Sequence, residues 1–143
     1  MEGFTVKDWM TANPIIVASN ITIPKAYWMM IDNKIRRLLV VDDDVLVGIV
    51  TINDLRQKIP YTAFAIDATK ASDMLSNYPI DRVMSVNPIT VACDDQLVDA
   101  ATLMITKHIS TLPVMDTNKL AGIITESDIF RAFVQIFEDI NLP

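Results

Sequence analysis

The segment GIVTIND at residues 48–54 recurs as GIITESD at residues 122–128, and this recurrence determines which fold the sequence predicts. When the chain is aligned with itself at an offset of 74 residues, residues 10–57 match residues 84–131 without a gap, and 18 of these 48 pairs are identical. Self-similarity at a fixed period is the signature of a repeat architecture, but two copies are too few for a solenoid. The sequence therefore predicts two related units arranged as a pseudo-twofold pair.

Composition limits the class of protein. With 143 residues the chain can form one compact domain or two fused half-size units. The apolar share of 51% is more than a monomer needs to bury and indicates an oligomer. The net charge of −6 argues against nucleic acid as a partner, because nucleic-acid binding needs a basic face.

The sequence also gives an expectation about location. The single cysteine, Cys93, cannot form an internal disulfide, which suits a reducing compartment. No apolar run is long enough to cross a membrane, and no signal peptide is visible at the start of the chain. We therefore expect a cytoplasmic protein with no membrane partner.

Each repeat is predicted to contain a strand, a helix, two strands and a second helix. The first strand follows an Asn-Pro turn, and the two later strands flank a polar break that is typical of a hairpin. The predicted strands lie at 15–17, 37–41 and 45–50 and at 89–91, 111–115 and 120–124, and the helices lie at 22–33, at 95–107 and after each Thr-x-x-Asp sequence. Each repeat should form a three-stranded sheet with two helices on one face, and sheet-to-sheet packing of the repeats would cover the other face. The predicted fold class is α+β, with two tandem β-α-β-β-α repeats.

The remaining segments complete the predicted organisation. We divide the chain into repeat 1 at residues 1–59, a linker at residues 60–82 and repeat 2 at residues 83–143. Residues 1–9 are too apolar for a free tail and are expected to pack on the first repeat. The linker is expected to contain a short helix that is capped by Asp67 and ends before Pro79.

The predicted helices carry recognisable ends and faces. Thr22 can cap the first helix, and Asp94 or Asp95 can cap the helix at 95–107. The last helix has an apolar stripe wider than one face of a small domain needs. Its members are Ile129, Phe130, Phe133, Val134, Ile136 and Phe137. We expect part of this stripe to face the core and the rest to form a homodimer contact.

The element order and three pairs of segments resemble the CBS domain family in its two-repeat arrangement, the Bateman module. The segments are WMTANPIIV at 9–17 with VMSVNPITV at 83–91, KIRRLLVVD at 34–42 with HISTLPVMD at 108–116, and the GIVTIND and GIITESD pair. The long linker and the sequence TESDIFRAFV at 125–134 resemble in particular the CBS proteins of the acetoin-utilisation type.

The Thr-x-x-Asp motifs, Thr51 with Asp54 and Thr125 with Asp128, are the main candidate ligand site. A threonine where a strand ends and a helix begins can donate to an anion beside the positive end of the helix dipole. A carboxylate three residues later can accept from the two hydroxyls of a ribose, but the same spacing also fits a capping box. The resemblance implies the ligand role, in which threonine contacts phosphate and aspartate contacts ribose.

Other site candidates precede the second strand of each repeat. Arg36 and Arg37 could pair with ligand phosphates, whereas repeat 2 has Ser110 and Thr111 at these positions. The resemblance implies that these residues line a nucleotide-binding cleft in each repeat. The two clefts should therefore differ in charge and in affinity for the nucleotide. The adenine would lie among apolar strand residues that could also serve only as core, namely Ile35, Ile49, Ile109 and Ile123.

No catalytic or metal-binding set is predicted. His108 is the only histidine, and no Cys, His or acidic cluster at metal-ligand spacing surrounds it. The run Asp42–Asp44 lacks the ligand-spaced glutamate and the turn glycine of a calcium loop, so it is expected to be a solvated turn. We expect a protein that is not an enzyme and needs no cofactor.

The leading hypothesis is a regulatory module that binds AMP, ADP or ATP as a regulatory ligand in the cleft between its repeats. Binding would act through different affinities for two arrangements of the pair and would be passed to a dimer interface or to an unidentified regulated protein. One alternative is a structural dimerisation module whose motifs only cap helices. Another is a binder of S-adenosylmethionine or a related adenosyl ligand, which would not need Arg36 or Arg37.

Overall fold

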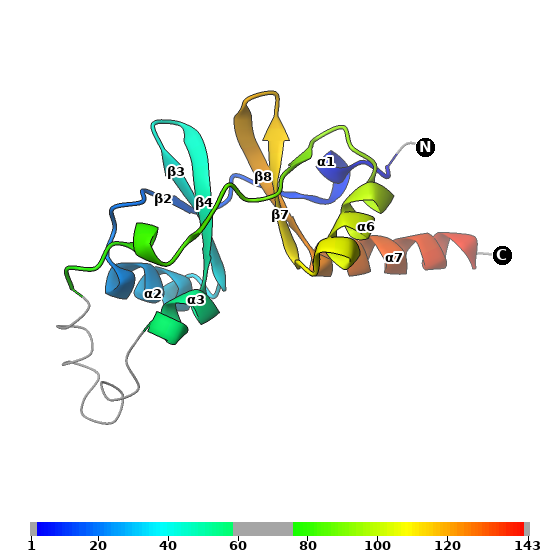
Figure 1. The fold of residues 1–143 in the computed structure, drawn as a ribbon. Coiled ribbons are helices and arrows are strands. Elements are labelled where there is room, and N and C mark those ends of the chain that lie inside the picture. Colours follow the sequence, from blue (N-terminus) through cyan, green and yellow to red (C-terminus); the bar gives the residue numbers. More distant parts are fainter. Residues whose placement is uncertain (1–2, 59–75, 142–143) are drawn as a thin grey trace. The chain divides into compact units, whose positions relative to one another are not determined.

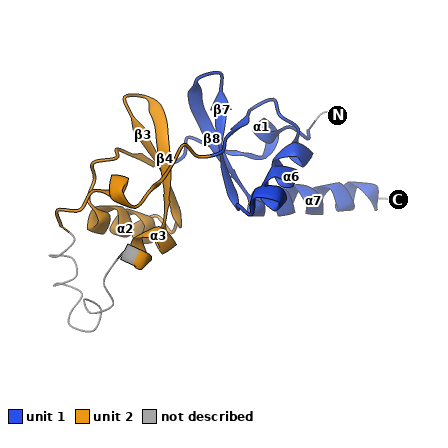
Figure 2. Cartoon of the chain, in the orientation of Figure 1, with its two compact units in different colours: residues 1–14, 89–143 blue, residues 15–88 orange. Residues whose placement is uncertain are grey.

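The structure is a computed structural model, and it describes residues 3–58 and 76–141. The chain divides into two compact units (Figure 2). Unit 1 consists of residues 1–14 and 89–143, and unit 2 consists of residues 15–88. The predicted linker helix, with its cap at Asp67, lies outside the described residues. No helix in the described ranges is both long enough and apolar enough to cross a membrane.

Unit 2 contains the predicted strand, helix, hairpin and helix of the first repeat (Figure 1). Its elements are β2 (Ile16–Val17), α2 (Ile23–Asp32), β3 (Arg37–Asp42), β4 (Val45–Thr51), α3 (Ile52–Lys58), the 3-10 helix η1 (Ile80–Arg82) and β5 (Ser85–Val86). The sheet order is β2-β3-β4-β5, with β2 parallel to β3 and the other pairs antiparallel.

Unit 1 has the same plan, built from the second repeat and the start of the chain. Its elements are α1 (Val6–Trp9), β1 (Thr11–Ala12), β6 (Val91–Ala92), α6 (Leu97–Lys107), β7 (Thr111–Asp116), β8 (Lys119–Thr125) and α7 (Glu126–Ile140). The sheet order is β1-β8-β7-β6, with β6 parallel to β7 and the other pairs antiparallel. The α+β class and the two tandem repeats are therefore confirmed.

Each sheet has four strands, whereas the sequence predicted three. The fourth strand comes from the segment that opens the other repeat: β1 pairs with β8, and β5 pairs with β4. Gly122 and Gly48 lie at these pairings, and the missing side chain lets the added strand approach closely. The added strands are only two residues long, so they carry no alternating pattern that would have predicted them.

The start of the chain packs in unit 1, so the prediction that it packs on the first repeat is wrong. Val6 is fully buried in the core cluster of the second repeat, and the backbone of residues 4–7 bonds to the segment before α6. Val6 N donates to Asp95 O at 2.9 Å, and Leu97 N donates to Phe4 O at 2.7 Å. Ile80, 74 residues after Val6, occupies the same place in unit 2, where its N donates to Ile21 O at 2.8 Å. The repeat therefore begins earlier than residue 10, and each opening segment fills the core of the other repeat.

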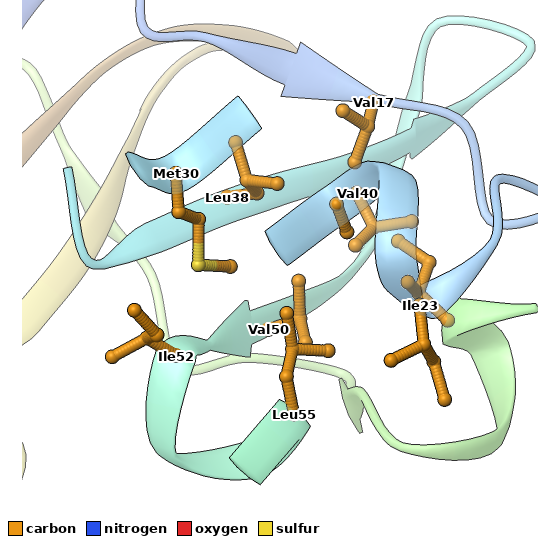
Figure 3. Close-up of a cluster of buried hydrophobic side chains, with 10 residues drawn as sticks. Val17, Ile23, Met30, Leu38, Val40, Val50, Ile52 and Leu55 are labelled. Atoms are coloured by element: carbon orange, nitrogen blue, oxygen red, sulfur yellow. The ribbon is translucent and has the colours of Figure 1, made fainter. Parts of the chain in front are cut away.

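Each unit has its own hydrophobic core beneath its helices. In unit 2 the core joins residues of β2, α2, β3, β4, α3 and η1 (Figure 3). Its buried members are Val17, Ile23, Ala26, Met30, Leu38, Val40, Val50, Ile52, Leu55 and Ile80. The corresponding cluster of unit 1 is Val6, Val91, Cys93, Leu97, Ala100, Met104, Leu112, Val114, Ile124 and Ala132. Alternate strand residues enter these cores, so the intervening residues belong to the opposite sheet face.

The predicted helix starts are partly correct. Thr22 is the N-cap residue of α2, although its side chain makes no capping hydrogen bond. The N-cap of α6 is Gln96 rather than Asp94 or Asp95. The Asp95 carboxylate instead accepts a hydrogen bond from Ala92 N at 2.8 Å, in the turn that precedes the helix.

The run Asp42–Asp44 forms the turn between β3 and β4. Asp43 and Asp44 are exposed and adopt positive φ angles of 48° and 64°, as in a tight hairpin turn. Asp42 Oδ1 accepts from Ser19 N at 2.9 Å and Asp42 Oδ2 accepts from the Ser19 hydroxyl at 2.5 Å, and these bonds hold the pKa of Asp42 below its usual value. This carboxylate therefore fastens the hairpin to the loop before α2.

Candidate ligand site

The first candidate site lies where β4 ends and α3 begins. Thr51 N donates to Asp54 Oδ2 at 2.9 Å, and Asp54 N donates to the Thr51 hydroxyl oxygen at 3.1 Å. These reciprocal bonds form a capping box, and both side chains remain partly exposed. The motif therefore caps the helix and keeps the threonine and the carboxylate side by side at the helix start.

The second candidate site has the same arrangement where β8 ends and α7 begins. Thr125 N donates to Asp128 Oδ2 at 2.8 Å, and the Thr125 hydroxyl lies 3.2 Å from the same oxygen. Asp128 differs from Asp54 because it is buried and its Oδ1 accepts from Arg131. Arg131 was not among the predicted site residues, although an arginine three residues after an aspartate on a helix is a recognisable ion-pair spacing.

The polar residues predicted before the second strand of each repeat lie at the same junctions. Arg36 O accepts from Ile52 N at 2.9 Å, and Ser110 O accepts from Glu126 N at 3.0 Å, so both residues are tied to the first residue of the following helix. Arg37 is paired with Thr51 in the β3–β4 register. Each unit therefore brings its threonine, its aspartate and the residues before its second strand together.

Thr111 occupies in unit 1 the position that Arg37 has in unit 2, because it is paired with Thr125 in the β7–β8 register. Its hydroxyl oxygen is buried and has no hydrogen-bond partner among the residues that the structure describes. A buried polar group without a partner costs about 1–3 kcal/mol. A ligand or water that bonds to this hydroxyl would remove the cost.

The four isoleucines that were predicted to line the adenine pocket fall into two pairs. Ile35 and Ile109 pack against the core clusters of their units. Ile49 and Ile123 precede the core residues Val50 and Ile124, so their side chains belong to the sheet face opposite the helices. Ile49 and Ile123 therefore share a sheet face with Thr51 and Thr125, because residues two apart on a strand point to the same side.

Two further side chains, His108 and Cys93, are candidates for reactivity by residue type. His108 is exposed and ends α6 in the left-handed conformation, with φ 55° and ψ 44°. Cys93 is a buried free cysteine, and burial raises the pKa of its thiol. A raised pKa keeps the thiol protonated and makes it a poor nucleophile.

The chain is a tandem module of two β-α-β-β-α repeats, each with a Thr-x-x-Asp motif where its hairpin ends and its last helix begins. The sequence model of the CBS domain matches residues 6–61 and 80–135. The chain therefore belongs to the CBS domain family. Both matched stretches include the segments that open the repeats.

Solved structures of three CBS proteins are similar to this chain along nearly its whole length. The acetoin-utilisation protein AcuB of Vibrio cholerae is 29% identical with a TM-score of 0.77, and the match covers 97% of this chain and 98% of AcuB. CBSX2, a chloroplastic protein of Arabidopsis thaliana solved with AMP, is 30% identical with a TM-score of 0.76 over 94% and 98% of the two chains. The CBS domain pair of MJ0100, solved with 5′-methylthioadenosine and S-adenosylmethionine, is 31% identical with a TM-score of 0.74 over 92% and 96%.

Curated relatives include longer proteins. The chain is 30% identical to MJ1225 of Methanocaldococcus jannaschii over 92% of its own length, but it spans only 48% of that protein. It is 36% identical to MJ1404 of the same organism and spans 32% of it. A CBS domain-containing protein of Dictyostelium discoideum, 29% identical, is covered over 94% of both chains.

Proposed function

We propose that this chain is a regulatory module, not an enzyme, that binds AMP, ADP or ATP at its strand-to-helix junctions. The observation that carries the proposal is the repeated pairing of a threonine and an aspartate at a helix start, beside Arg36 and Arg37 in unit 2. The helix start and the arginines suit a phosphate, and the carboxylate suits a ribose. Binding of AMP by CBSX2 supports this assignment.

Helix capping by the motif is compatible with ligand binding. A carboxylate has two oxygens with about four acceptor positions, and the capping bonds use only Oδ2 of Asp54 and Asp128. The alternative in which the motif serves only to cap predicts that no adenosyl ligand changes stability. That outcome is tested directly by the ligand titration below.

A second ligand class is favoured by a specific similarity. MJ0100 was solved with S-adenosylmethionine and 5′-methylthioadenosine, which share adenosine with AMP but carry no phosphate. Arg36 separates the nucleotides from 5′-methylthioadenosine, because its guanidinium can pair with a phosphate and 5′-methylthioadenosine has no anionic group. We favour the nucleotides because unit 2 has two arginines at this position.

A thermal-shift titration with AMP, ADP, ATP and S-adenosylmethionine tests the proposal. At a hundred times Kd a nucleotide should stabilise the protein by about 2.7 kcal/mol, which appears as a higher Tm. Arg36→Gln should reduce the nucleotide shift, whereas Lys25→Gln, which removes an exposed charge on α2, should leave it unchanged. If no ligand raises Tm at millimolar concentration, the chain is a structural module.

The last helix, α7, supplies the proposed homodimer contact. Ile129 packs against the core and Ala132 is buried, while a second stripe at helical spacing is more than half exposed. The exposed stripe is Phe130, Phe133, Val134, Phe137 and Ile140. Exposed apolar patches of this kind mark interaction sites, and a second copy of α7 offers a matching apolar stripe.

Phe133→Glu combined with Phe137→Glu should convert the dimer to a monomer, because two charges would enter the apolar contact. Sedimentation velocity measures the change, with Gln135→Glu on the same helix as the control. A wild-type chain that sediments as a monomer would refute the dimer contact. We further propose that the protein acts in the cytoplasm on a regulated partner that recognises the liganded dimer.

A further inference from the structure

The ion pair between Arg131 and Asp128 distinguishes the two candidate sites. Asp128 Oδ2 accepts from Thr125 N and from the Thr125 hydroxyl, and Oδ1 accepts from Arg131 Nη2. The Asp128 side chain is 3% exposed, whereas the Arg131 side chain is 62% exposed. A buried carboxylate is thus covered by an arginine that reaches it from solvent.

The bonds that Asp128 already accepts limit the acceptor positions that remain for a ligand. A carboxylate offers about four lone-pair positions. Thr125 and Arg131 together use three of them on Asp128. The two hydroxyls of a ribose need two positions, so they cannot both bond to Asp128 while Arg131 is in place.

Unit 2 has no arginine at the equivalent place. Gln57 follows Asp54 by three residues, as Arg131 follows Asp128, and its exposed amide carries no charge. As in unit 1, the backbone N–H of the threonine donates to the aspartate, here from Thr51 to Asp54 Oδ2. At this helix position repeat 2 therefore has a cationic side chain and repeat 1 has a neutral amide.

We propose that Arg131 competes with the ligand for Asp128 and sets the adenine-nucleotide affinity of unit 1 below that of unit 2. This inference rests on the function proposed above and adds the residue that makes the two sites unequal. Arg131 is a positioning residue, since it acts through Asp128. Because most of its side chain is in water, displacing it changes the affinity only a few-fold.

Exchange of the two residues tests the inference by calorimetric titration with AMP. Asp54→Asn leaves the unit 1 site, and in this background Arg131→Gln should tighten AMP binding roughly three- to fivefold. Asp128→Asn leaves the unit 2 site, and there Gln57→Arg should weaken binding by a similar factor. Arg131→Lys keeps a cation near Asp128 and should restore most of the wild-type affinity.

The melting temperature of each unliganded variant checks folding. Weaker or unchanged binding in Arg131→Gln would overturn the inference, and weaker binding would place Arg131 on the ligand instead. If the wild-type chain binds no adenine nucleotide, the proposed function fails together with this inference. If the wild type binds and the exchange changes neither affinity, this inference fails alone.

Discussion

Gly122→Ala should destabilise the protein by about 1–3 kcal/mol, the usual cost of an overpacked site. A Cβ on Gly122 would lie 2.6 Å from the Thr11 carbonyl oxygen and 2.8 Å from Met10 Sδ. The methionine side chain can turn away, but the carbonyl belongs to the backbone of β1. The substitution should therefore separate β1 from β8 and disturb the segment that places Val6 in the core.

Urea unfolding measures this effect, and Gly48→Ala is the matched comparison. There the nearest atom is the flexible Met84 Sδ at 2.7 Å, with the Ser85 carbonyl oxygen at 2.9 Å. The loss at Gly48 should be the smaller of the two. Replacing glycine with alanine at an unstrained position usually stabilises a protein. If Gly122→Ala leaves the stability unchanged or raises it, the pairing of β1 with β8 does not need a glycine at this position.

Asp54→Asn should lower the affinity for adenine nucleotide on the order of a hundredfold while the protein stays folded. The asparagine carbonyl can still accept from Thr51 N, so the capping bond survives. Its amide group cannot accept the second ribose hydroxyl, and the negative charge is gone. Asp54→Ala should lose the capping bond as well as the nucleotide affinity, and the lost cap should lower the stability by about 1 kcal/mol.

Thermal unfolding of both variants with and without AMP separates the two roles of Asp54. If Asp54→Asn keeps its full nucleotide-induced rise in Tm, the carboxylate does not bind the ribose. Asp128→Asn provides the comparison in unit 1, where Arg131 already occupies part of the carboxylate. Its effect on total binding should be smaller than that of Asp54→Asn.

The repeat made most of the fold predictable. The hairpins were predicted to within about one residue of β3 at Arg37–Asp42 and β4 at Val45–Thr51, because a polar break between two apolar runs has few other solutions. The pairing of β1 with β8 was missed, since a two-residue strand carries no period of its own. The exchange of opening segments is a long-range effect, and only the weak similarity of Phe4 to Tyr78 and Val6 to Ile80 signals it.

The candidate site was predicted in outline for the same reason. Thr51 and Thr125 stand at strand ends in both copies, so their place at a helix start followed from the element order. The bond from Arg131 to Asp128 is specific to repeat 2, because repeat 1 has Gln57 at the equivalent position. A pattern common to both copies could not show this difference.

Isothermal titration calorimetry of the wild-type protein with AMP shows whether the chain binds adenine nucleotides. We expect saturable binding with two unequal affinities, of which the tighter one is lost in Asp54→Asn. Absence of binding heat at millimolar AMP, ADP and ATP would contradict the claim and leave the Thr-x-x-Asp motifs as helix caps alone.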